Sequence, residues 1–182
     1  ENLRYAMVGS GSWATALVHT RERNKINVWW HIRNEEVLES LQTEGFNAKY
    51  LSDVEFNQQY INPTKDINEV VRNCEVILVA TPSAFIKNVL SELTESLENK
   101  FILSATKGII AEDYTTITEY FNKAYGLPYD NLGLISGPSH AEEVSRNKLS
   151  YLTVTCKDAD NAQKIGEMFR NDTFKVSHST DI

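Results

Sequence analysis

A glycine-rich segment near the start of the chain has the residue types and the spacing that phosphate binding requires. The segment Gly9-Ser-Gly-Ser-Trp-Ala14 follows an apolar run and precedes a helix-like stretch, which is the context of a GxGxxG/A motif. Gly9 permits a tight turn, Gly11 lets the backbone approach a pyrophosphate, and Ala14 lets the helix pack closely on a strand. Free N–H groups at the helix start attract phosphate oxygens. The segment predicts a dinucleotide site, and a purely structural glycine turn is the alternative.

The end of the next apolar run carries basic side chains where an acid is usual in NAD sites. A carboxylate about 20 residues beyond the glycines typically binds the ribose 2′-hydroxyl of NAD. This position reads Trp29-Trp-His-Ile-Arg33 here, with no Asp or Glu before Glu35. His31 and Arg33 are compatible with the 2′-phosphate of NADP, but also with ordinary solvated residues at a strand end. The two tryptophans are interpreted as core residues.

Two later apolar runs end in groups that suit an oxygen-rich ligand. Ligands of open α/β sheets bind beyond the carboxyl ends of the strands, where Lys107 and Gly137 are expected. The Lys107 ammonium group could hold a substrate oxygen or share in proton transfer, whereas many lysines at strand ends are simply solvated. Gly137 and Ser139 could present N–H and hydroxyl donors to the same ligand or form a plain helix cap. No cluster of His, Cys, Asp and Glu predicts a metal site.

These groups need a scaffold, and short apolar runs alternate with amphipathic stretches along the whole chain. The alternation predicts βαβ units and an α/β fold of the Rossmann type, doubly wound, with a mainly parallel sheet and helices on both faces. The expected strands are Leu3–Val8, Ile26–Trp30, Glu75–Ala80, Phe101–Thr106, Leu132–Ser136, Tyr151–Cys156 and Phe174–Ser177. The expected helices are Ser12–Glu22, Glu35–Glu44, a short one capped by Asp66, Ser83–Leu97, Tyr114–Tyr125 and Ala159–Phe169. Residues 1–182 are interpreted as one domain, with a loop at Phe46–Pro63.

The composition excludes several classes of protein. The chain has 182 residues, of which 41% are hydrophobic, and this length buries a core without disulfides or metals. No apolar run approaches the ~20 residues that span a bilayer, and no signal-peptide pattern opens the sequence, so a cytoplasmic protein is expected. The net charge of −7 gives no footprint for nucleic acid. Cys74 and Cys156 are expected to be buried thiols.

Taken together, the motifs resemble the N-terminal half of the bacterial type of NAD(P)-dependent glycerol-3-phosphate dehydrogenase. The resemblance extends over nearly the whole chain, and several motifs in one order are far more specific than the glycine turn alone. These motifs are Gly9-Ser-Gly-Ser-Trp-Ala-Thr-Ala-Leu17, Val28-Trp29 with His31, Asn47-Ala-Lys-Tyr-Leu51, Val79-Ala-Thr-Pro-Ser83, Ser104-Ala-Thr-Lys-Gly-Ile109 and Ser136-Gly-Pro-Ser-His-Ala-Glu-Glu-Val144.

The resemblance implies a role for each matching residue. Besides the glycine turn, it implies NAD(P)H contacts for Ser12, Trp13, His31, Tyr50, Phe85, Lys107 and Ala141. It implies substrate contacts for Lys107, Gly137 and Ser139, with Lys107 as the catalytic residue that reaches both ligands. The implied reaction is reversible hydride transfer between NAD(P)H and C2 of dihydroxyacetone phosphate, which gives sn-glycerol 3-phosphate for phospholipid synthesis.

The resemblance also implies a second domain, which residues 1–182 do not contain. In this family a helical domain follows, with the lysine for proton transfer and the basic residues that grip the substrate phosphate. Residues 1–182 are therefore expected to be the cofactor domain and to be inactive alone. The resemblance is compatible with a full-length protein that forms a homodimer. Ser52 and His140 depart from a common proline and a common phenylalanine of the family. A non-catalytic dinucleotide-sensing module and a dehydrogenase of the 6-phosphogluconate or β-hydroxyacid type are the alternatives.

Overall fold

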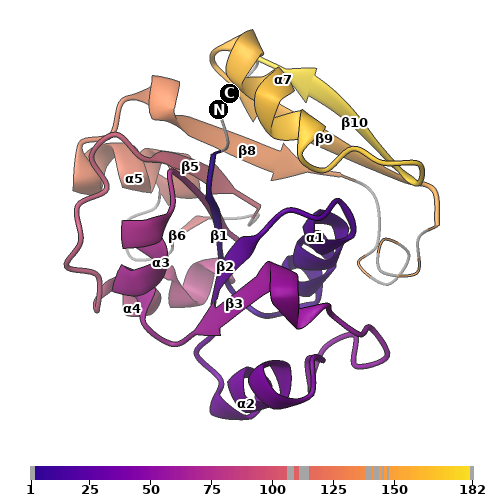
Figure 1. Ribbon diagram of the computed structural model, residues 1–182. Helices are drawn as coiled ribbons and strands as arrows, with labels where there is room; N and C mark the ends of the chain where they lie inside the picture. The colour runs from indigo at the N-terminus through magenta and orange to yellow at the C-terminus, as the bar shows by residue number, and fades with distance from the viewer. Residues whose placement is uncertain are drawn as a thin grey trace.

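Short apolar segments form the strands and amphipathic segments form the helices, as the alternation along the sequence predicts (Figure 1). The computed structural model describes residues 3–105, 109–110, 115–137, 141, 144, 146 and 148–180. The strands are β1 (Tyr5–Val8), β2 (Val28–His31), β3 (Ile61–Thr64), β4 (Val76–Val79), β5 (Phe101–Ser104), β6 (Ile109–Ile110), β7 (Thr115–Thr116), β8 (Leu132–Ser136), β9 (Ser150–Cys156) and β10 (Phe174–Ser179). The helices are α1 (Ser12–Arg23), α2 (Glu35–Thr43), α3 (Ile67–Asn73), α4 (Ile86–Leu90), α5 (Ile117–Tyr125) and α7 (Ala159–Glu167), with 3₁₀ turns at Gln58–Tyr60, Ser83–Phe85 and Tyr129–Asn131.

One sheet of eight strands has the order β3-β2-β1-β4-β5-β8-β9-β10. Its neighbouring strands are parallel except β8 and β9, and β6 and β7 form a separate antiparallel pair. From β1 the chain moves outward through β2 and β3, and then in the other direction through β4 and β5. The order therefore reverses between β1 and β4, and ligands of open α/β sheets bind beyond the carboxyl ends of strands at such a point. The structure confirms the expected Rossmann-type fold.

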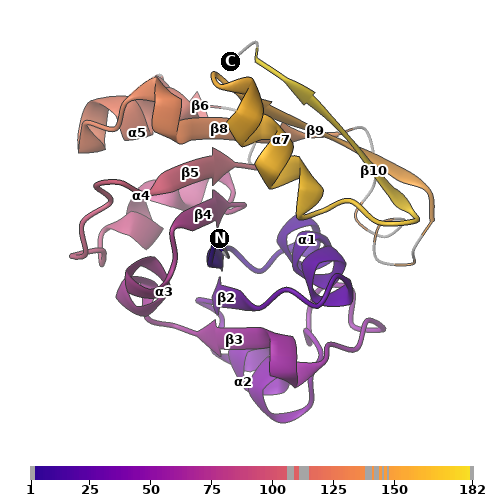
Figure 2. The same cartoon turned by 45° about the horizontal axis from the view of Figure 1, so that its top comes forward.

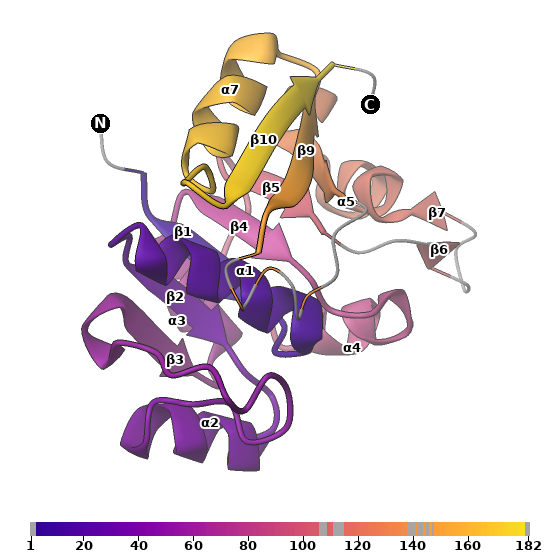
Figure 3. The ribbon, with the colours of Figure 1, turned by 90° about the vertical axis from the view of Figure 1, so that its right-hand side faces the viewer.

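Helices cover both faces of the sheet, and each face has its own apolar core. Figure 2 shows α3, α4 and α5 on one side of the sheet and α1 and α7 on the other. The helix α7 packs against β9 and β10, as Figure 3 shows. Alternate residues of β1 divide between the cores, since Tyr5 and Met7 belong to one and Ala6 and Val8 to the other. All four are buried, which is why this strand reads as a continuous apolar run.

The structure corrects the sequence prediction for the end of the segment Phe46–Pro63. Ile61–Thr64 is not part of a loop but forms β3, which pairs in parallel with β2 at the edge of the sheet. Pro63 has no N–H to donate, and an edge strand tolerates this because one of its sides has no partner strand. Only Ile61 is fully buried in β3, so the apolar pattern that would indicate a strand is missing from the sequence.

The helix expected at Ser83–Leu97 is shorter in the structure, where α4 spans only Ile86–Leu90. The backbone N–H groups of Thr94 and Glu95 donate to the side-chain Oδ1 of Asn68 in α3 at 2.7 and 3.0 Å. A contact between segments that are distant in sequence therefore replaces the helical hydrogen bonds that the local pattern predicts. None of the helices that the structure describes is long and apolar enough to cross a membrane.

Several chemically distinctive groups are buried in the apolar cores. Cys74 and Cys156 are buried free thiols, as expected, and burial raises their pKa values to about 12 and about 11. Arg21 of α1 is fully buried, with its Cζ 3.7 Å from the ring centre of Tyr5 and 5.2 Å from that of Phe169. Its Nε and Nη1 have no hydrogen-bond partner among the described residues. Burial lowers the pKa of Arg21 to about 10, so the guanidinium is still charged at neutral pH.

Candidate functional site

The glycine turn lies at the carboxyl end of β1, where the order of the sheet reverses. Gly9 has a φ of +127°, a conformation that residues with a side chain rarely adopt. A Cβ atom on Gly9 would lie 2.9 Å from the carbonyl carbon of Ala80, just beyond β4. The turn therefore needs glycine both for its conformation and for its close approach to β4, as the motif predicts.

The strand β2 holds this turn in place. The Gly9 N–H donates to the backbone O of His31 at 3.3 Å, and the Trp30 Nε1–H donates to the Gly9 backbone O at 2.7 Å. Trp30 is fully buried, so its indole N–H needs an acceptor inside the protein, and its interpretation as a core residue is confirmed. Both polar backbone groups of Gly9 are thus fixed by β2.

The start of α1 is open on the side of the turn. Gly11 is the N-cap, no described side chain caps this helix end, and the first turn contains no acidic residue. Gly11 has an ordinary φ of −74°, and a Cβ atom there would meet nothing within 4 Å among the described residues. Ser12 is exposed, and Ala14 is buried against the sheet as the motif requires. Uncapped N–H groups, the positive end of the helix dipole and free space at Gly11 fit a pyrophosphate.

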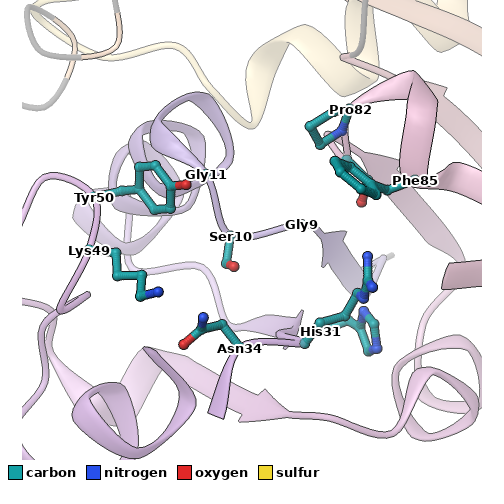
Figure 4. A pocket seen from close by; sticks show the side chains of 11 residues that line it. Gly9, Ser10, Gly11, His31, Asn34, Lys49, Tyr50, Pro82 and Phe85 are labelled. Carbon is teal, nitrogen blue, oxygen red and sulfur yellow. The ribbon is translucent and has the colours of Figure 1, made fainter. Parts of the chain in front are cut away.

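A cavity of about 520 Å³ lies in front of the turn (Figure 4). Lys49 and Tyr50 lie on one side of it, Pro82 and Phe85 lie on the other, and Ser10 of the turn lies between them. Tyr50 and Phe85 are 43% and 50% exposed, so both rings are accessible to a ligand. The residues that line the cavity are Gly9, Ser10, Gly11, His31, Arg33, Asn34, Lys49, Tyr50, Thr81, Pro82 and Phe85.

The described residues that line this cavity include cations and no carboxylate. Arg33 lies with its Cζ 5.8 Å from the ring centre of Phe85, and Lys49 lies with its Nζ 3.9 Å from a Glu36 oxygen outside the lining. His31 also lines the cavity, but it is buried rather than solvated. Burial lowers the pKa of His31 below its ordinary value, so this imidazole is neutral at pH 7. Among the described residues of the lining, the positive charge therefore comes from Arg33 and Lys49.

The structure brings together some of the residues that the sequence indicated and leaves others elsewhere. The lining includes Gly9, Gly11, His31, Tyr50 and Phe85. It does not include Ser12, Trp13, Ala141 or Gly137, and Lys107 and Ser139 lie outside the described residues. Trp13 and Ala141 are both partly buried and pack against the apolar core that contains Tyr5 and Met7. A Cβ atom on Gly137 would lie 2.5 Å from the backbone O of Tyr151, so packing against β9 also requires glycine at this position.

Sequence reasoning missed part of the lining. Asn34 is the N-cap of α2, where its Oδ1 accepts a hydrogen bond from the Val37 N–H at 3.0 Å. Lys49 lies on the loop that follows α2, one residue before Tyr50. Its position next to Tyr50 is the sequence feature that points to Lys49, because the family resemblance implies a cofactor contact for Tyr50. The described residues contain no group of three or more His, Cys, Asp and Glu side chains that could hold a metal ion.

The chain is similar to known proteins over almost its entire length. Residues 4–162 match the model of the family described as NAD-dependent glycerol-3-phosphate dehydrogenase N-terminus. Glycerol-3-phosphate dehydrogenase [NAD(P)+] of Ligilactobacillus salivarius is 28% identical over 98% of this chain and 54% of the relative. The enzyme of that name from Francisella tularensis subsp. mediasiatica is 33% identical over 97% of this chain and 53% of the relative.

A solved structure agrees with the sequence matches at the level of the fold. The crystal structure of glycerol-3-phosphate dehydrogenase from Coxiella burnetii superposes with a TM-score of 0.87, at 24% identity, over 100% of this chain and 55% of that chain. The chain thus spans about half the length of the curated relatives that it matches. On the family match and the glycine turn at the end of β1, the chain belongs to the NAD-dependent glycerol-3-phosphate dehydrogenase family and corresponds to its N-terminal, NAD-binding part.

Proposed function

We propose that the chain binds NAD(P)H for reversible hydride transfer with C2 of dihydroxyacetone phosphate, which gives sn-glycerol 3-phosphate for glycerophospholipid synthesis. The observation that carries the proposal is the start of α1, where the uncapped helix end at Gly11 opens onto a cavity lined by cations. Membership of the glycerol-3-phosphate dehydrogenase family supports the identity of the reaction. The dinucleotide, when bound, supplies the hydride donor or acceptor.

The chain's own residues would bind and orient this cofactor. The N–H groups at the start of α1 would hold the pyrophosphate, because they are uncapped and lie at the positive end of the helix dipole. The rings of Tyr50 and Phe85 would cover the bound molecule from opposite sides and exclude water from it. His31 would bind as a neutral group, either accepting or donating one hydrogen bond.

The groups for the chemical step are proposed from the family resemblance. Lys107 would contact both the cofactor and the substrate oxygen, and Gly137 and Ser139 would contact the substrate. We further propose that residues 1–182 act as one cofactor domain and that turnover also needs groups from the helical domain expected in this family. The greater length of the matched relatives supports this view. The chain alone is therefore expected to bind dinucleotide without appreciable reduction of dihydroxyacetone phosphate, and robust turnover would overturn this expectation.

The cations at the cavity favour a dinucleotide with a third phosphate. No described residue of the lining is a carboxylate that could act as the usual acidic partner of the ribose hydroxyls of NADH. Arg33 and Lys49 instead suit the 2′-phosphate of NADPH, since charge-assisted bonds to phosphate are the stronger ones. We therefore propose that these two side chains make the chain prefer NADPH.

Calorimetric titration with NADPH and NADH tests the proposed dinucleotide binding and the proposed preference for NADPH on the same chain. Wild-type protein should bind either nucleotide and bind NADPH more tightly. Arg33→Gln and Lys49→Gln should each weaken NADPH binding about tenfold, while NADH binding changes little. Lys157→Gln is the matched control, because Lys157 is an exposed lysine outside the lining. Binding of neither nucleotide would overturn the proposed function, whereas equal binding of both would overturn only the NADPH preference.

A further inference from the structure

The buried side chain of Asn47 makes four hydrogen bonds, which connect the glycine turn and α1 with the loop that follows α2. It is 0% exposed, and its Nδ2 donates to the backbone O of Ser10 and to Oγ1 of Thr15, both at 3.0 Å. Its Oδ1 accepts from the backbone N–H groups of Lys49 and Tyr50, also both at 3.0 Å. A primary amide has two donors and two acceptor positions, so none of them is left unused.

On one side, these bonds set the direction of the peptide groups in the glycine turn. Asn47 holds the Ser10 carbonyl, and Thr15 holds the Gly11 carbonyl through its Oγ1 at 2.7 Å and its backbone N–H at 2.9 Å. In a planar trans peptide the C=O and the next N–H point in opposite directions. The N–H groups of Gly11 and Ser12 are therefore directed away from Asn47 and Thr15. These are the groups that the start of α1 offers to a phosphate.

On the other side, the same side chain shapes one wall of the cavity. The bonds that Oδ1 accepts from the Lys49 and Tyr50 N–H groups hold the backbone of two residues whose side chains line the cavity (Figure 4). Elsewhere in this loop, the Ala48 N–H donates to Ser40 Oγ at 3.2 Å, and the Gly45 N–H donates to the Ser40 backbone O at 3.0 Å. The position of Lys49 and Tyr50 relative to the turn therefore depends on Asn47.

We propose that Asn47 is a positioning residue for the dinucleotide, which aligns the phosphate-binding turn and the Lys49–Tyr50 wall through one side chain. The inference rests on the proposed function of the cavity. Asn47 itself does not line the cavity, so it acts through the groups that it holds. Its loss should weaken nucleotide binding by folded protein, beyond any effect on stability.

Nucleotide binding by folded variants tests this role. Asn47→Ala removes the bonds on both sides and is expected to weaken NADPH binding about tenfold or more. Circular dichroism and thermal melts establish that each variant is folded at the temperature of the titration. Asn57→Ala is the matched control, because Oδ1 of exposed Asn57 accepts a similar bond from the Gln59 N–H at 3.0 Å and Asn57 lies outside the cavity lining. This control is expected to bind NADPH as the wild type does.

Asn47→Asp gives a readout that a merely structural role would not change. An ionised carboxylate still accepts from the Lys49 and Tyr50 N–H groups, but it cannot donate to Ser10 or Thr15. A protonated carboxyl group regains one donor. The ratio of the variant Kd to the wild-type Kd should therefore be high at pH about 8 and should fall as pH is lowered to about 5. A structural role alone predicts a ratio near one in folded protein at every pH.

A second pair of variants keeps the test decisive if the Asn47 variants do not fold. Thr15→Val removes the hydroxyl that links Asn47 to the turn, and Thr15→Ser retains it. Weaker NADPH binding by Thr15→Val, with wild-type binding by Thr15→Ser, supports the proposal. Wild-type affinity in folded Asn47→Ala or in Thr15→Val overturns it and leaves the proposed function standing. A wild-type chain that binds no dinucleotide overturns both.

Discussion

Replacing Gly11 by valine should separate ligand binding from fold stability. Gly11 has a φ of −74°, and a Cβ atom there meets nothing within 4 Å among the described residues, so the backbone accepts a side chain without strain and its Cβ atom without a clash. Losing a glycine N-cap lowers the free energy of unfolding, and restricting the unfolded chain raises it, each by up to about 1 kcal/mol. The free energy of unfolding should therefore change by less than about 1 kcal/mol.

The same side chain would occupy the space through which a pyrophosphate reaches the start of α1. A charge-assisted hydrogen bond contributes about 1.5–3 kcal/mol, so the loss of even one weakens binding about 10- to 150-fold. Isothermal titration calorimetry with NADPH measures the Kd, and urea denaturation of the same preparation measures stability. We expect a large increase in the Kd for NADPH and a small change in the free energy of unfolding.

Gly126→Ala is the matched control for this experiment, because it should show the opposite pattern. Gly126 ends α5 with a φ of +67° and lies outside the cavity lining. Alanine in this left-handed conformation should lower the free energy of unfolding by about 1 kcal/mol and leave the Kd unchanged. Wild-type NADPH affinity in Gly11→Val, or a loss of several kcal/mol of stability there, would refute the reasoning.

Substitutions at three further residues probe groups that hold the site and the core. Gly9→Ala places a side chain at φ +127° and 2.9 Å from Ala80, so urea titrations should show a loss of about 2 kcal/mol or more. Burial lowers the pKa of His31, so the unfolded chain binds this proton more readily than the folded one. Stability should thus fall as pH drops from about 7 to about 5, and His31→Gln should flatten this dependence in melts across the range. Arg21→Met removes a buried charge whose Nε and Nη1 have no described hydrogen-bond partner, so in urea titrations it should be as stable as the wild type or up to about 3 kcal/mol more stable. Arg21→Ala should be less stable, because it leaves a cavity in the core.

The glycine turn shows how far the sequence alone could describe the candidate site. Gly9, Gly11 and Ala14 are close neighbours in the chain, and the structure agrees with the motif at all three. The turn conformation requires glycine at position 9, Ala14 is fully buried, and Gly11 leaves open space at the start of α1. Lys49 and Asn34 are different, because each reaches the cavity from its own loop and nothing near it in sequence indicates the other. The sequence indicates their neighbours Arg33 and Tyr50, but only the fold shows that Asn34 and Lys49 themselves line the same cavity.

By itself, the sequence determined the alternation of strands and helices, the turn between β1 and α1, and helix caps such as Asp66. These features depend on conformational preferences and hydrogen bonds within a few residues, which a linear pattern records. Only the tertiary structure decided that His31 is buried and neutral, that α4 ends early, and that Asn47 joins two sides of one cavity. Desolvation and contacts between distant segments arise only when the chain is folded, and for that reason the sequence pattern does not contain them.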